Sequence, residues 1–171
     1  MKKIFSATIL FLVLMAGNVF AQEKPLHEVY SMMVYNFVKY VQWPANSGSG
    51  DFVIGVVGNT EMYNTMAKWY NGNKIGTHTC VVKQFKSAAD VSDAQVIFID
   101  RSKSGEFDDI NSKTKGKNTL IVTDKNGLGE RGSSINFKVV DSKLKFELNQ
   151  KALEASNLKV ASSLAAMAIL I

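Results

Sequence analysis

The stretch FVIGVVGN (Phe52–Asn59) decides the fold class, because six consecutive apolar or small residues end there in a Gly-Asn turn. Two shorter runs of the same kind follow, VIFI at 96–99 and LIV at 120–122. Runs that are hydrophobic on both faces are typical of buried parallel strands. Helical patterns at 61–70 and 105–112 separate the three runs. The sequence therefore predicts βαβ units and an open, mostly parallel sheet.

An amphipathic helix is expected upstream of the first apolar run. It should end before the Trp-Pro pair at 43–44, since proline disfavours helix in the residue before it. Its apolar positions recur at three- and four-residue steps and are Leu26, Val29, Met33, Phe37 and Val41.

Downstream of the third run the period changes to two. Apolar and polar residues alternate through 135–139 and 144–148, on either side of a tight turn, which predicts an antiparallel hairpin with one solvated face. Asn149 is expected to cap a final helix over 150–171. The predicted fold class is α/β: a three-layer, open, mostly parallel sheet of Rossmann-like or flavodoxin-like type, with a C-terminal antiparallel hairpin and a final helix.

The start of the chain predicts export. Two lysines precede an almost wholly apolar run at 4–15, and Val-Phe-Ala at 19–21 is a small-x-small cleavage pattern. The apolar core is too short to span a bilayer stably, and no stop-transfer flank supports the alternative of an uncleaved anchor. We expect residues 1–21 to be a signal peptide cleaved after Ala21, and residues 22–171 to form a single exported domain that does not itself span the membrane.

Charge and cysteine content argue against nucleic-acid binding and against an intramolecular disulfide. The net charge of +5 falls by two when the lysines of the signal peptide are lost, and no arginine-rich stripe with interleaved aromatics remains, so nucleic acid is not an expected partner. Cys80 is the only cysteine and cannot form an intramolecular disulfide. Its apolar, strand-like surroundings favour a buried, unreactive thiol, while an intermolecular disulfide stays open.

Motifs for catalysis or cofactors are weak. The GxGxxG at 127–132 precedes another strand rather than a helix, so it fits a loop better than a dinucleotide site. His78 and Cys80 share one face of a strand, but no third orienting residue is evident for a nucleophilic pair. Paired Cys/His spacing for a structural metal is absent from the sequence. We therefore expect no enzyme activity, no cofactor and no metal.

A candidate ligand site follows from the strand ends. Polar residues come directly after each of the three apolar runs, and ligands of open α/β sheets bind at the carboxyl edge. The alternative is that these residues only cap helices and turns. The candidate ligand-binding residues are Gly58, Asn59, Asp100, Arg101, Ser102 and Asp124.

Five segments, in the right order, resemble the YfiR family of periplasmic proteins (DUF4154). They are YNFVKYVQWP at 35–44, the first strand at 52–58, AQVIFI at 94–99, the stretch from 123 to 137 that ends in SSINF, and the close from FELN at 146 to Leu164. Together they cover most of the chain after the signal peptide.

The resemblance implies a periplasmic signalling or regulatory protein, often a homodimer. It would bind and modulate the extracytoplasmic part of a membrane-bound diguanylate cyclase, and so cyclic-di-GMP signalling, or of a sensor histidine kinase. The alternative is a periplasmic small-molecule-binding module that uses the carboxyl edge of the strands. Many relatives carry cysteine where this chain has Ala94, so control through an intramolecular disulfide is not expected here.

Overall fold

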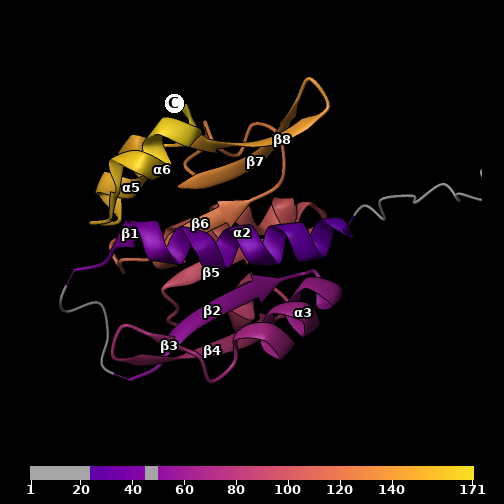
Figure 1. Cartoon of the computed structure of the whole chain (residues 1–171), viewed down its shortest axis with the longest axis vertical. Coiled ribbons are helices and arrows are strands. Elements are labelled where there is room, and N and C mark those ends of the chain that lie inside the picture. The colour runs from indigo at the N-terminus through magenta and orange to yellow at the C-terminus, as the bar shows by residue number, and fades with distance from the viewer. Residues whose placement is uncertain (1–23, 45–49) are drawn as a thin grey trace, which may run out of the picture.

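The computed structural model describes residues 24–44 and 50–171 (Figure 1). The predicted signal peptide and its cleavage site lie outside these residues. Within the described part of the chain, every helix is too short or too polar to cross a membrane.

The main sheet of the described residues contains eight strands: β2 (Phe52–Val57), β3 (Lys74–Ile75), β4 (His78–Phe85), β5 (Val96–Ile99), β6 (Leu120–Thr123), β7 (Ile135–Val140), β8 (Lys143–Leu148) and β10 (Ile169–Leu170). Their order across the sheet is β10-β8-β7-β6-β5-β2-β4-β3. The five central strands, β7 to β4, are parallel, whereas β3 and β8 run antiparallel to their inner neighbours. The predicted mostly parallel sheet is confirmed.

Helices connect and cover these strands. They are α2 (Leu26–Tyr40), α3 (Thr60–Tyr70), α4 (Phe107–Thr114), α5 (Gln150–Ala155) and α6 (Ser162–Met167), with 3-10 turns η1 (Ala88–Asp90) and η2 (Arg101–Glu106). A small antiparallel sheet joins β1 (Val41–Gln42) to β9 (Lys159–Val160).

Successive residues of β5 divide between two hydrophobic clusters, because side chains alternate across a strand. Val96 and Phe98 belong to the cluster formed with α2 and α3. Ile97 and Ile99 belong to the cluster that contains Phe107 of α4. Figure 1 shows α2 lying across the front of β6 and β5. The strands are therefore covered on both faces, which confirms the three-layer arrangement.

The hairpin of β7 and β8 matches its prediction at the turn. Asp141 and Ser142 have φ of 49° and 59°, as a two-residue type I′ turn requires. The prediction of a fully solvated face was wrong at the inner end of the hairpin. Asn136 is 0% exposed and Glu147 is 4% exposed. They hydrogen-bond each other under the loop that contains Gly129, so a covering loop hides polar positions that alternation assigns to solvent.

The apolar face of α2 is turned relative to the predicted one. Leu26 is 50% exposed, whereas Tyr30 and Val34 are buried together with Phe37, Val38 and Val41. Both sets follow helical spacing. The structure selects the second because the Tyr30 ring stacks on an aromatic ring of β7 with 4.4 Å between ring centroids.

The predicted final helix over 150–171 is wrong beyond its first turns. Asn149 does cap it, accepting the backbone N–H of Ala152 at 2.9 Å. However, α5 ends where Asn157 adopts a φ of 53° and its N–H bonds back into the helix. The N–H of Leu158 donates to the carbonyl of Leu153, and both side chains are buried, which completes a Schellman stop. The chain then adds β9, the short α6 and the edge strand β10.

Cys80 should be unreactive in the folded protein. It lies on β4 with no exposed surface, and burial raises the pKa of its thiol to about 11. A rise of two units from 9.0 lowers the thiolate fraction near neutral pH about a hundredfold. We expect Ellman's reagent to label the native protein far more slowly than the urea-unfolded chain. Equal labelling rates for the native and the unfolded protein would contradict the buried position of Cys80. A dimer that dissociates when a reducing agent is added would instead support the intermolecular disulfide.

Candidate functional site

The carboxyl ends of β2 and β5 form the topological switch point of the sheet. The chain goes from β2 to β4 on one side and then crosses to β5 on the other, so the connections leave in opposite directions. Open α/β sheets place ligand crevices at such points. Gly58 and Asn59 follow β2, and Asp100 follows β5, as the strand-end pattern predicts.

Three of the six predicted residues hydrogen-bond to one another there. Asn59 Nδ2 donates to Asp100 Oδ2 at 3.0 Å, while Asn59 Oδ1 caps α3 by accepting the N–H of Met62. Asp100 Oδ1 accepts both the backbone N–H and the hydroxyl of Ser102, at 2.9 and 2.6 Å. Burial acts to raise the pKa of Asp100, but these hydrogen bonds outweigh it and the pKa is lowered. Asn59 and Asp100 therefore act as structural caps, the alternative that the sequence left open.

Gly58 completes this group through its backbone. Its φ is +97°, and a Cβ built on it would lie 2.5 Å from Cγ of Lys103 and 3.3 Å from the hydroxyl of Ser102. The stem of Lys103 thus packs against the turn that could otherwise offer free N–H groups to an anion.

Alanine at Gly58 should destabilise the protein by about 2 kcal/mol, from the strain of a positive φ together with the contact on Lys103. Alanine at Gly127 is the matched control: its φ is +87°, but nothing lies within 4 Å of a Cβ there, and strain alone should cost about 1 kcal/mol. Chemical denaturation of both variants measures the difference. Equal losses would mean that η2 does not press on this turn.

The remaining two predicted residues form an ion pair one strand further along. Arg101 Nε donates to Asp124 Oδ2 at 3.0 Å, and Nη2 reaches the backbone carbonyl of Asp124 at 3.4 Å. The Asp124 side chain is 3% exposed, against 59% for Arg101. Burial raises the pKa of Asp124, although Arg101 opposes the shift. All six predicted residues therefore lie along one edge, in two adjoining groups.

A cavity of about 250 Å³ opens beside this ion pair. Arg101 and Asp124 are the only predicted residues that line it. Lys125 and Asn126 could have been found, because they directly follow Asp124 in the sequence. Tyr30 and the strand residues could not, because no local pattern links α2 or β7 to the end of β6. The lining residues are Tyr30, Arg101, Asp124, Lys125, Asn126, Phe137, Lys138 and Val139.

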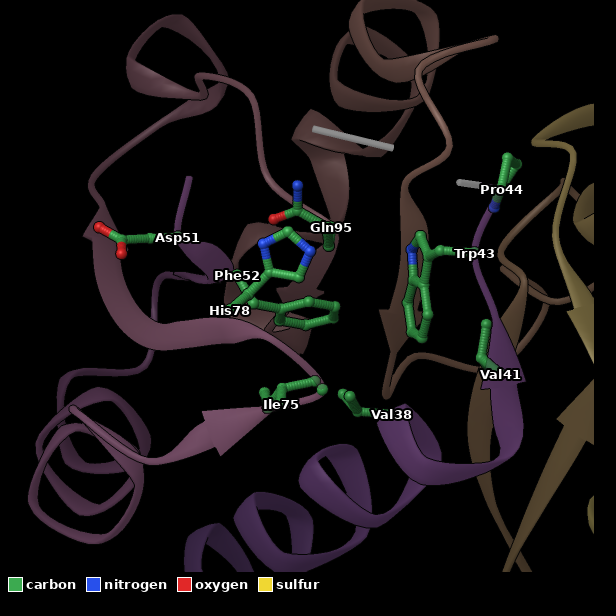
Figure 2. A pocket seen from close by; sticks show the side chains of 10 residues that line it. Val38, Val41, Trp43, Pro44, Asp51, Phe52, Ile75, His78 and Gln95 are labelled. Carbon is green, nitrogen blue, oxygen red and sulfur yellow. The ribbon is translucent and has the colours of Figure 1, made fainter. Parts of the chain in front are cut away.

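A second cavity, of about 290 Å³, lies at the amino edge of the strands (Figure 2). The rings of Trp43 and Phe52 meet edge to face there, with 5.1 Å between centroids. The indole N–H of Trp43 donates to the carbonyl of Asn118, and His78 Nδ1 lies 2.6 Å from the carbonyl of Gly50. Its lining residues are Val38, Val41, Trp43, Pro44, Asp51, Phe52, Ile75, Gly76, His78 and Gln95.

Within residues 24–44 and 50–171, neither edge of the sheet assembles a familiar catalytic group. His78 is held at Gly50 on the surface, whereas Cys80 is buried in the core, which removes the pair weighed from the sequence. Among the described residues, no group of three His, Cys, Asp or Glu side chains could hold a metal ion.

Comparison with known proteins identifies the family. The family model DUF4154, described as YfiR/HmsC-like, matches residues 27–169, which is nearly the whole described domain. The chain belongs to the YfiR/HmsC-like family. Both cavities and the whole carboxyl edge fall within the matched region. The YfiR/HmsC-like family is periplasmic and regulatory.

A solved structure shows that the YfiR/HmsC-like domain shares its fold with another class of protein. It is described as the ABC domain in complex with L-Trp from Streptococcus pneumoniae, with a TM-score of 0.54 at 12% identity. The match covers 82% of this chain and 59% of that chain. At this identity the likeness concerns the fold alone. No curated protein matches the chain.

Proposed function

We propose that this protein is an exported periplasmic regulator, which binds the extracytoplasmic part of a membrane-bound diguanylate cyclase or sensor histidine kinase and modulates its activity. The observation that carries the proposal is the family match over residues 27–169. In this proposal residues 1–21 are the signal peptide, residues 22–171 are one periplasmic domain, and that domain forms a homodimer.

The arrangement of the carboxyl edge supports binding rather than catalysis. The side chains of Asn59, Asp100 and Ser102 at the switch point hydrogen-bond to one another, and Lys103 packs over Gly58. An enzyme of this architecture would present such groups to a substrate. Regulation by contact with a partner needs no such group.

Deletion of the gene tests the output. If the protein restrains a cyclase, cellular cyclic-di-GMP should rise on deletion and return when the full chain is supplied. If it acts on a kinase, phosphorylation of the cognate regulator should change instead. A chain without residues 1–21 is the control, since it stays in the cytoplasm and should not complement. If deletion changes neither cellular cyclic-di-GMP nor phosphorylation of the regulator, the proposal is contradicted.

A second candidate function is small-molecule binding at the carboxyl edge, favoured by the cavity beside Asp124. The structural relative was solved with L-Trp, which makes free amino acids a reasonable first set of probes. A ligand at a hundred times its dissociation constant adds about 2.7 kcal/mol to stability, so thermal unfolding detects it. The two functions are compatible if a ligand controls binding of the partner. A screen in which no compound raises the melting temperature would count against the second function.

A further inference from the structure

The Arg101–Asp124 ion pair leaves donors unused at the mouth of the cavity. A guanidinium carries five N–H donors. Two of them contact Asp124. The Arg101 side chain is 59% exposed, so its remaining donors are open to a ligand.

Asp124 leaves an acceptor unused on the inner side. Its Oδ2 is held by Arg101, but its Oδ1 is buried and has no hydrogen-bond partner among the residues that the structure describes. A buried carboxylate oxygen without a partner is costly, so native proteins rarely keep one. Asp124 is one of the lining residues, so its unpartnered oxygen is the nearest buried acceptor for a donor group placed in the cavity.

The rest of the lining favours an anion. Arg101, Lys125 and Lys138 contribute three positive charges to the cavity wall, and Asp124 contributes one negative charge. Lys138 is partly neutralised by Glu147, 2.6 Å away on β8. Lys125 is exposed beside Asp124, and a lysine at the mouth of a concave site attracts small anions.

We propose that this cavity binds a small carboxylic acid with a hydrogen-bond donor on its α-carbon, that is, an α-hydroxy or α-amino acid. The carboxylate contacts the free N–H groups of Arg101 and the ammonium of Lys125, and the α-substituent donates to Asp124 Oδ1. Because Arg101 and Asp124 are 3.0 Å apart, the complementary groups of the ligand must also be neighbours. The proposal rests on the second candidate function, for which it names the ligand class.

Entry requires a side-chain movement. Asp124 Oδ1 is covered from solvent, so the ligand reaches it only when a neighbouring side chain shifts. The exposed lining side chains of Lys125 and Val139 can shift without breaking the Arg101–Asp124 ion pair, so the geometry that selects the ligand is kept.

Calorimetric titration of the exported domain tests the proposal. The probes are L-lactate, L-malate and L-serine; propionate, succinate and ethanolamine lack either the α-donor or the carboxylate. We expect at least one probe of the first group to bind with heat that its counterpart does not produce. Asp124→Asn should weaken that binding about tenfold or more, since a hydrogen bond to a charged group is lost. Lys125→Gln, at an exposed position, should weaken it several-fold and keep the preference for the α-donor.

Asp108→Asn is the matched control, because Asp108 forms the other arginine–aspartate pair, with Arg131 at 2.6 Å on the surface. It should bind the probes as the parent does. Equal binding of lactate and propionate, or unchanged binding to a folded Asp124→Asn protein, would overturn the proposal. Absence of binding by all α-substituted acids would also overturn it. If an unrelated compound still raised the melting temperature, ligand binding as a function would survive that result.

Discussion

Phe137→Ala is expected to lower the free energy of unfolding by about 3–5 kcal/mol, the range for removing a buried aromatic ring. Phe137 is 2% exposed and connects three elements. Its ring stacks on Tyr30 of α2, lies 5.8 Å from the ring of Phe37, and sits opposite Phe146 across the hairpin. Loss of the ring would leave a cavity between the hairpin and α2.

Val139→Ala is the matched control for this experiment. Val139 lies two residues further along β7, on the same face, but is 64% exposed. Its truncation should change stability by less than about 0.5 kcal/mol. Urea denaturation followed by circular dichroism measures both variants. A loss below about 1 kcal/mol for Phe137→Ala would mean that the hairpin does not depend on its packing against α2.

Asn136→Leu is expected to cost about 3 kcal/mol, because it leaves a buried carboxylate oxygen of Glu147 without a donor and removes one of the two partners of the Thr123 hydroxyl, which keeps Ser133. Asn136 Nδ2 donates to Glu147 Oε2 at 2.9 Å, and its Oδ1 accepts from the hydroxyl of Thr123 at 2.7 Å. Glu147 would keep only its contact with Lys138. A leucine of similar size fills the space but replaces neither hydrogen bond.

Asn126→Leu serves as the control for this change. Asn126 is exposed in the loop after β6, so the same substitution should be nearly neutral for stability. Thermal unfolding at neutral pH separates the two variants. Two equal melting temperatures would show that the buried hydrogen bonds between β6, β7 and β8 contribute nothing net to folding.

The parts of the fold that the sequence predicted correctly depend on short-range patterns. Buried strands such as Phe52–Val57 appear as continuous apolar runs, and asparagine caps such as Asn59 and Asn149 precede helical spacing. The tight turn of the hairpin is similarly local. Such features are fixed by nearest neighbours, so one sequence suffices to place them.

The parts that failed depend on long-range packing or on one unusual dihedral. The spacing in α2 does not place Tyr30 on the buried face, because its partner ring is on β7, far along the chain. Glu147 reads as a solvated strand residue until the Gly129 loop covers it. The C-terminal segment has helical composition throughout, but the left-handed conformation of Asn157 ends α5 early. The spacing of apolar residues along the chain is not enough to predict any of these three features.

The candidate site divides in the same way. Its position at the carboxyl edge follows from strand order, and all six predicted residues lie there. Whether such residues cap or bind depends on which atoms remain free. The side chains of Asn59, Asp100 and Ser102 hydrogen-bond to one another. One carboxylate oxygen of Asp124, Oδ1, has no hydrogen-bond partner among the described residues.

The most direct test of the proposed regulatory function is a crosslinking pull-down of the tagged, exported protein from its own cell envelope, with captured proteins identified by mass spectrometry. The tagged chain without residues 1–21 is the control for capture after lysis. The account predicts enrichment of a membrane-bound diguanylate cyclase or sensor histidine kinase through its extracytoplasmic part. An eluate in which no membrane protein is enriched over the control would contradict it.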